Sequence, residues 1–334
     1  MLLPLFQALL LLTTLPLAHS QQRCQWATLR AATDALLDDL TTPPSTPLTS
    51  NPLYSPNLTY THNGALLPNI HSPPSIFASA PLTLLTTHTI LDQDRCAAFG
   101  KFIATFNSTS SSQEGGKEKE ERVVSRLVGL QAHYSYDPTR SIPTLVEKID
   151  VVSVGKGDGL IQDEVDSEQF EGYVNNEGWR SLSEDEQDGW EGLEGVAGGW
   201  LDWLGGGNTS NTTSGGGNDN GSEKGGESED EIEKRLWGRP CSRLDGGVYT
   251  AAAKEGESCV QGAKVQGEGE GKGITERKFL VDDSVGAVSV LARDGSLGGA
   301  PCVFEFRIVR GKLKYVHRFA ATSGLGEKGG KESV

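Results

Sequence analysis

Alternating apolar and polar residues fill most of the chain between Ile274 and Ala320. Four such runs are separated by short turn-forming segments, which is the pattern of an antiparallel meander, because side chains along a strand point alternately to its two faces. The last two runs flank Arg310-Gly311, and a two-residue loop with glycine is a strong hairpin signal. The pattern therefore predicts a four-stranded sheet that ends in a hairpin.

Pairing outward from this turn places Ile308 opposite Leu313, Phe306 opposite Tyr315 and Phe304 opposite His317. Tyr315 and His317 then share the buried face with the phenylalanines. Two interpretations follow: His317 is a core histidine satisfied by a backbone carbonyl, or it lines a pocket as an acid or base. The opposite face is expected to be exposed and carries Glu305, Arg307, Lys314 and Arg318.

Helical spacing of apolar residues occurs in two other segments. The first runs from Cys24 to Leu40, and the second runs from Asp185 to Leu204 and is rich in tryptophan. Residues 57–69, 126–136 and 144–154 predict strands and turns. Residues 87–106 favour a strand, although their spacing also suits a helix.

The two halves share a plan of helix, turn-rich segment, strands and hairpin, in which Asp150 aligns with His317. A helix laid across a curved antiparallel sheet suits the cone-shaped NTF2-like (SnoaL-like) fold. We therefore predict an α+β chain of two NTF2-like units, consistent with an internal duplication. The predicted boundaries are 1–20 for a signal peptide, 21–155 for the N-terminal unit, 156–178 for an acidic connector, 179–320 for the C-terminal unit with a disordered insert at 205–234, and 321–334 for a flexible tail.

The first twenty residues form an apolar run that is broken by Pro4 and Pro16 and ends in Ala18-His19-Ser20. This run predicts a secretory signal peptide; a membrane anchor is the alternative, but the run is short for a span. We expect a secreted, extracellular glycoprotein, because Asn-X-Ser/Thr sequons occur at Asn57, Asn107, Asn208, Asn211 and Asn220. Lys234-Arg235 resembles a dibasic processing site, and a pair of solvated charges is the alternative.

Five cysteines fit an oxidising compartment, in which two disulfides and one leftover thiol are expected. Their spacing does not fix the connectivity. The pairing that we propose is Cys24–Cys96 and Cys241–Cys259, which leaves Cys302 buried at the start of a strand. No cysteine or histidine spacing indicates zinc, so no metal site is predicted.

The formal net charge is −15. An acidic surface argues against nucleic acid or an anionic membrane as a partner. The chain has no GxSxG elbow, no HExxH motif and no Walker loop, and its Asp/Asn-rich segments do not fit a calcium loop. We therefore expect no cofactor, and a small molecule or carbohydrate as the ligand.

Several segments resemble a family of fungal secreted proteins of unknown function. These segments are CxxxLRxATDALL from residue 24, NLTYTHNGALL, RCAAF, the Trp-rich helix, GRPCSRLDGGVYT, RKFLVDDSVGAVSVL and EFRIVRGKLKYVHRF. The resemblance covers most of the chain after the signal, except the inserts at 107–122 and 205–234. It implies a fungal source, secretion and two disulfides, and no established reaction. Family members more often carry an acidic residue in place of His62, which weakens a catalytic role there.

Inward or turn-positioned polar side chains are the remaining candidates for a site. The catalytic candidates are His317, Tyr315 and Asp245. Arg243 and Asp245 could instead form a structural ion pair, since charge pairs serve both roles. The candidates for ligand binding are Tyr60, His62, Tyr136, Asp150, Arg243 and Tyr249.

Three functions are consistent with these features. The first is a protein that binds a small or sugar-like ligand in an NTF2-like cavity. The second is a cofactor-independent isomerase or lyase that uses the inward His317–Tyr315 pair for proton transfer. The third is an extracellular effector or cell-wall-associated protein whose glycosylated exterior is the working surface.

Overall fold

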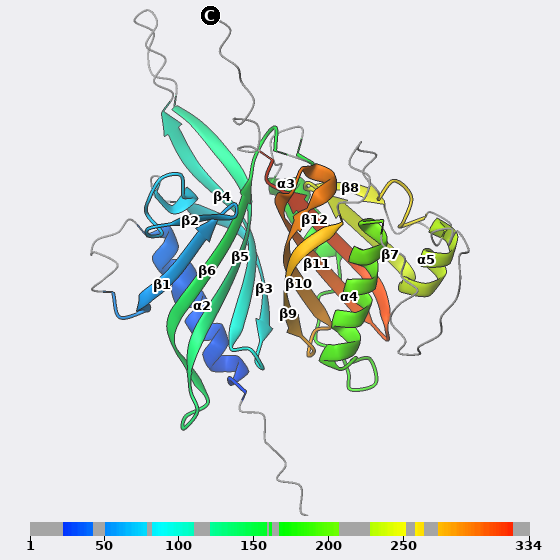
Figure 1. The fold of residues 1–334 in the computed structure, drawn as a ribbon, viewed down its shortest axis with the longest axis horizontal. Helices are drawn as coiled ribbons and strands as arrows, with labels where there is room; N and C mark the ends of the chain where they lie inside the picture. The colour runs from blue at the N-terminus through cyan, green and yellow to red at the C-terminus, as the bar shows by residue number, and fades with distance from the viewer. Residues whose placement is uncertain are drawn as a thin grey trace, which may run out of the picture.

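Two units, each a six-stranded mixed sheet with a helix on its outer face, make up the computed structural model of the chain (Figure 1). The described residues are 23–42, 51–78, 82–109, 121–158, 160–161, 167–206, 228–251, 258–263 and 273–322. The predicted signal peptide, the sequons at Asn208, Asn211 and Asn220, and the tail beyond Thr322 lie outside this part of the chain.

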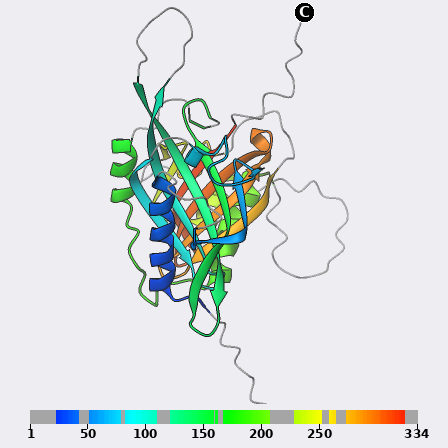
Figure 2. The ribbon, with the colours of Figure 1, turned by 90° about the vertical axis from the view of Figure 1, so that its left-hand side faces the viewer.

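The first unit has the strand order β2-β1-β6-β5-β4-β3. Helix α2 crosses one face of the sheet (Figure 2) and buries its leucines against Phe102, Val128 and Ile149. The elements are α2 (Trp26–Thr41), β1 (Tyr54–His62), β2 (Ala65–Leu67), the 3-10 turn η2 (Ile76–Ala78), β3 (Thr83–Asp92), β4 (Ala97–Thr109), β5 (Glu121–Asp137) and β6 (Ile142–Val154).

The second unit repeats this topology in the order β8-β7-β12-β11-β10-β9. Trp200 and Trp203 of its helix fill the space against Phe304 and Phe306. Its elements are α4 (Trp190–Leu204), α5 (Glu229–Leu236), β7 (Trp237–Asp245), β8 (Val248–Ala251), β9 (Ile274–Asp282), β10 (Ala287–Asp294), the 3-10 turn η4 (Gly295–Leu297), β11 (Ala300–Val309) and β12 (Lys312–Ala320). Helix α3 (Ser167–Asn176) lies in the connector between the units.

Strand pairing confirms the topological duplication. Asp150 lies on β6 between Thr61 and Gln131, and His317 takes the same place on β12 between Leu244 and Glu305. The sheets were predicted to be antiparallel and are instead mixed, because β1 pairs with β6, and β7 with β12, in parallel.

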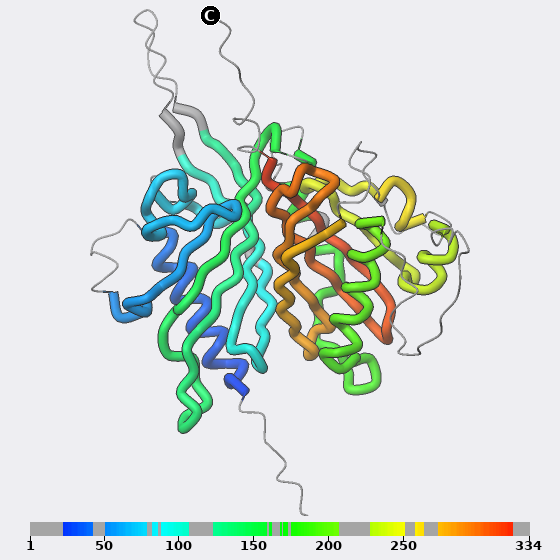
Figure 3. The backbone as a smooth tube through the Cα atoms, viewed as in Figure 1, coloured from blue at the N-terminus to red at the C-terminus, as the bar shows by residue number. Residues whose placement is uncertain are grey.

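The two sheets pack face to face, as the tube in Figure 3 shows. Apolar side chains from both inner faces form one core, which includes Phe99, Val152, Val303 and Phe319. The sheets approach closely at Gly129, where an added Cβ would lie 2.8 Å from Val303 Cγ2 and 3.0 Å from Phe319 Cζ.

The edge strands β3 and β9 meet through a reciprocal contact. Asp282 accepts a hydrogen bond from the backbone N–H of Leu91 (3.2 Å), and Asp92 accepts one from Val281 (3.0 Å). Such an exchange of equivalent contacts is what a twofold interface produces. Each carboxylate also satisfies a backbone donor that an edge strand would otherwise leave unpaired.

Replacing either Asp92 or Asp282 with alanine is expected to cost about 1–3 kcal/mol of unfolding free energy, because a buried N–H loses its acceptor. Chemical denaturation measures this loss. Asp34 is the control, since its pair with Arg30 is exposed and its removal should cost less than about 0.5 kcal/mol. Equal effects at all three positions would contradict the assigned contacts.

The last hairpin departs from the predicted register. Ile308 does pair with Leu313, but a β-bulge then shifts the strands, so that Arg307 faces Tyr315, Glu305 faces His317 and Phe304 faces Arg318. An extra residue on one strand changes which face its later side chains occupy. Tyr315 and His317 therefore lie opposite Arg307 and Glu305, not opposite the phenylalanines as predicted.

The face that was predicted to be exposed is largely buried, because the first sheet covers it. The exposed fraction of Glu305 is 0% and that of Arg307 is 2%. The bulge places Arg318 on the face of Phe304 instead, where it is also buried and forms an ion pair with Asp294. The alternation of apolar and polar residues was predicted correctly, but the prediction that the polar face is exposed to solvent was wrong.

Two predicted boundaries in the second unit are also corrected. The tryptophan-rich helix begins at Trp190, not at Asp185. The insert that was predicted to be disordered through residue 234 ends in helix α5, which Ser228 and Glu231 begin with a reciprocal capping box. Lys234 and Arg235 lie in the last turn of this helix.

The predicted disulfides Cys24–Cys96 and Cys241–Cys259 are both formed, and Cys302 is a buried free cysteine. Among the helices that the structure describes, none is long and apolar enough to span a membrane.

Candidate functional site

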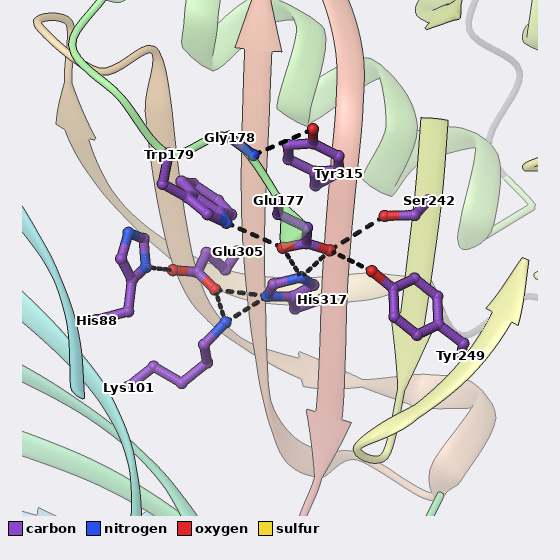
Figure 4. Close-up of polar contacts among 10 residues, drawn as sticks. All are labelled: His88, Lys101, Glu177, Gly178, Trp179, Ser242, Tyr249, Glu305, Tyr315 and His317. Atoms are coloured by element: carbon purple, nitrogen blue, oxygen red, sulfur yellow. Dashed lines mark hydrogen bonds and ion pairs between the residues drawn. The ribbon is translucent and has the colours of Figure 1, made fainter. Parts of the chain in front are cut away.

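Five ionisable side chains meet between the two sheets (Figure 4). They are His88 of β3, Lys101 of β4, Glu177 of the connector, Glu305 of β11 and His317 of β12, and we call them the buried ionic cluster. Lys101 and Glu305 are almost completely inaccessible, with side-chain exposures of 1% and 0%. Buried charges require partners, and in this cluster the partners come from both sheets and from the connector.

Glu305 is the centre of the cluster. One carboxylate oxygen contacts His88 Nδ1, and the other contacts Lys101 Nζ and lies 2.8 Å from His317 Nδ1. Burial alone would raise the pKa of this carboxyl, but Lys101, His88 and the bonds from the histidines outweigh it and hold the pKa well below its usual range. Glu305 is therefore an ionised acceptor.

His317 lies between two carboxylates. Its Nε2 is 2.9 Å from Glu177 Oε1, and its Nδ1 faces Glu305. Burial lowers the pKa of the imidazole. The charge of Glu177 and the hydrogen bonds raise it by a larger amount, so the net shift is upward. Nδ1 also contacts Lys101 Nζ. Both ring nitrogens of His317 are therefore engaged within the cluster, and neither is free for a ligand.

Glu177 fixes the connector to the second unit. Its carboxylate accepts hydrogen bonds from Ser242 (3.0 Å), Tyr249 (3.2 Å) and Trp179 Nε1 (2.9 Å). Burial tends to raise its pKa, yet the neighbouring His317 lowers it overall. These contacts hold Trp179 over the edge of the cluster.

A groove opens beside the cluster at the junction of the units, with a volume of about 650 Å³. Trp179 and His88 line it, and their rings lie 4.3 Å apart between centroids. The guanidinium of Arg307 stands 5.9 Å from the Trp179 ring. Other residues of the lining are Trp26, Arg30, Thr89, Leu91, Gln93, Ser181, Asp282, Ser284 and Val285.

The predicted catalytic trio is not assembled. His317 belongs to the buried ionic cluster, while the Tyr315 hydroxyl accepts a hydrogen bond from the backbone of Gly178 (3.3 Å). Asp245 pairs instead with Arg243 at 2.8 Å. Arg243 also donates to the carbonyls of Cys259 and Gln261. The Arg243–Asp245 ion pair therefore has the structural role given above as the alternative, and it anchors the loop that carries the disulfide.

The remaining predicted ligand-binding residues do not form one site either. Tyr249 joins the cluster through Glu177, but Tyr60 bonds to Ser75 (2.6 Å) and Tyr136 to Ser141 (3.2 Å). His62 is buried, and burial together with Arg126 lowers its pKa to about 4. Asp150 binds Thr61, Lys148 and Lys278 beside a second, smaller cavity.

The sequence analysis missed four of the five members of the cluster, namely His88, Lys101, Glu177 and Glu305, and also Trp179 and Ser242, which bond to Glu177. Lys101 interrupts an otherwise apolar stretch of β4, and this was an available signal of a buried charge. Glu305 alternates with apolar residues and gave no such signal. No comparable signal marks Glu177, which follows an acidic, glycine-rich segment.

Metal binding has no candidate in the part of the chain that the structure describes, where no group of three or more His, Cys, Asp or Glu side chains is placed to hold an ion. Of the predicted glycosylation sites, Asn57 is exposed on β1 and Asn107 lies on β4.

Comparison with known proteins gives a family match for part of the chain. Residues 227–320 match the model of a domain of unknown function, DUF8021. No curated protein matches the sequence. Among solved structures, the chain is similar to Mtr2 of Candida albicans, with 11% identity, 38% of this chain and 93% of that chain covered, and a TM-score of 0.23.

Proposed function

We propose that this chain is a secreted, N-glycosylated protein of two NTF2-like units that binds a small, sugar-like ligand in the groove between them. The helix laid across one face of each sheet supports the NTF2-like assignment. Two disulfides and an exposed sequon at Asn57 support the extracellular location. The ligand site differs from the predicted one, since bulky side chains fill the space under α4.

The observation that carries this proposal is the composition of the groove. Trp179 is held in place through its indole N–H, and Trp26 is 47% exposed at the same groove. Sugars present apolar C–H faces to aromatic rings and hydroxyls to polar groups, and an indole offers a large, rigid apolar surface. Thr89, Gln93, Ser181 and Asp282 supply donors and acceptors along the lining. Ligand pockets also occur preferentially between domains.

Trp179→Ala is expected to weaken sugar binding by at least about tenfold, in keeping with the loss of an aromatic anchor. The measurement is calorimetric titration with neutral monosaccharides, namely glucose, xylose, fructose and N-acetylglucosamine, and with their short oligomers. Trp190→Ala is the matched control, because Trp190 is 37% exposed but packs against Arg95 outside the groove lining.

Binding that is lost equally in both variants would contradict the groove as the site. Saturable binding to none of these sugars would contradict the proposal itself. The glycosylated exterior would then be the remaining candidate for the working surface, as in an extracellular effector or a cell-wall-associated protein.

A further inference from the structure

His88 occupies the one place where the buried ionic cluster and the groove meet, as far as the structure describes the chain. Its side chain is 16% exposed and lines the groove. Nδ1 contacts Glu305, and the other nitrogen of the ring is directed away from the cluster (Figure 4). Among the described residues, this Nε2 atom has no hydrogen-bond partner.

Glu305 determines which nitrogen of His88 carries the proton. Lys101 and His317 both donate to this fully buried carboxylate, so it remains an acceptor and requires a donor at His88 Nδ1. The neutral ring is therefore the Nδ1–H tautomer, with the lone pair on Nε2, the nitrogen that is directed away from the cluster. A carboxylate that orients a histidine in this way also stabilises the imidazolium formed when Nε2 takes a proton.

We propose that His88 is a catalytic acid–base residue that moves a proton on a carbonyl-bearing sugar bound against Trp179. This inference rests on the proposed function, because it requires the sugar-like ligand to lie in the groove. It transfers the isomerase hypothesis from His317, which has both nitrogens engaged, to a histidine with one free nitrogen.

The chemistry requires no oxidant and no cofactor. Nε2 removes a proton from the carbon next to the carbonyl, the C–H electron pair forms a C=C bond, and the carbonyl π pair moves to oxygen to give an enediolate. Side-chain donors of the lining, such as Thr89, Gln93 and Ser181, are available to stabilise the developing oxyanion. The proton of the neighbouring hydroxyl moves to this oxyanion, the imidazolium returns its proton to the former carbonyl carbon, and the new carbonyl lies on the adjacent carbon, so the product is an isomer of the substrate.

The test is hydrogen exchange in D2O. Glucose, xylose and fructose are incubated with the intact protein, and proton NMR follows the loss of the C–H signal next to the carbonyl. The wild type is expected to exchange this proton faster than buffer does. His88→Asn should reduce the rate by about 10²–10⁴-fold, because asparagine can still donate to Glu305 but lacks Nε2.

His71→Asn is the matched control. His71 is half-buried, and its Nδ1 contacts the carbonyl of Phe77 (3.0 Å), away from the groove. This variant should exchange at the wild-type rate. Calorimetric titration of His88→Asn should still show saturable sugar binding, since Trp179 is intact, so that a lost exchange rate is assigned to the chemical step.

The outcomes separate this inference from the proposed function. A sugar that binds without any exchange above buffer would overturn the catalytic role and leave the binding function standing. Exchange that persists in His88→Asn would also overturn the role of His88. Absence of binding by all three sugars would overturn the catalytic role, and absence of binding by the whole panel, including N-acetylglucosamine and the short oligomers, would overturn the proposed function as well.

Discussion

Replacing Lys101 with methionine is expected to lower the free energy of unfolding by about 3–5 kcal/mol, which is the usual cost of removing one partner of a buried ion pair. Methionine keeps most of the apolar stem, so the group lost is the ammonium. Glu305 and Glu177 would remain buried with one fewer cation near them. Guanidinium denaturation at pH 6, followed by tryptophan fluorescence, measures the change.

Lys278→Met is the matched control for this experiment. Lys278 also pairs with a buried carboxylate, Asp150 at 3.1 Å, but its side chain is 44% exposed and Asp150 keeps Lys148 at 2.8 Å. Its loss should cost no more than about 1 kcal/mol. If the two methionine variants were equally stable, the energetic importance of the buried cluster would be refuted.

A double variant tests whether the stability lost in Lys101→Met comes from the carboxylate that is left without a partner. In Lys101→Met/Glu305→Gln, neither charge remains, and the glutamine carbonyl can still accept a hydrogen bond from a neighbouring histidine. The double variant is therefore expected to be more stable than Lys101→Met alone. A strictly additive loss would mean that the two side chains do not interact.

The fold could be predicted from the sequence to the level of its elements. The period-two pattern from Ile274 to Ala320 correctly predicted four strands, and the shared plan of the halves predicted the repeated topology. Period-two reasoning could not predict the bulge between Ile308 and Arg307. A bulge adds one residue to one strand and leaves no mark in apolar spacing, yet it decided where His317 lies.

The site was predicted much less well than the fold, because it depends on how two sheets meet. Glu305 alternates with apolar residues, as an exposed residue of a one-sided sheet would. Only the packing of the second sheet against the first turns that position into the centre of a buried cluster. Glu177 and His88 come from segments far apart in the sequence, so no local pattern could bring them together.

The unfolding free energy is expected to fall as the pH rises above about 6.5, and His317 is the cause. Its folded pKa is raised above the ordinary histidine value of 6.5. A group of this kind binds its proton more tightly when folded, so its stabilisation is fully present below pH 6.5 and is lost as the pH rises through its folded pKa. Denaturation midpoints at pH 6.5 and pH 9 measure this alkaline loss.

Other shifted groups act outside this range. Glu177 and Glu305 have lowered pKa values, so their stabilisation is present above about pH 4.5 and is lost only as the pH falls through their folded values. His62 and His133, whose pKa values are lowered chiefly by burial, oppose folding below pH 6.5 and are neutral above it. The loss between pH 6.5 and pH 9 can therefore be assigned to His317.

His317→Phe is expected to cost about 3–5 kcal/mol at pH 6.5, because Glu177 and Glu305 lose the cation between them. The same change should flatten the dependence of the unfolding free energy on pH between pH 6.5 and pH 9, because the variant lacks the group whose raised pKa produces that dependence. His317→Gln offers a milder variant, since its amide can still donate to one carboxylate while the titration is removed. Should either variant retain the wild-type dependence on pH, another residue would have to be the titrating group, and the assignment of the alkaline loss to His317 would be disproved.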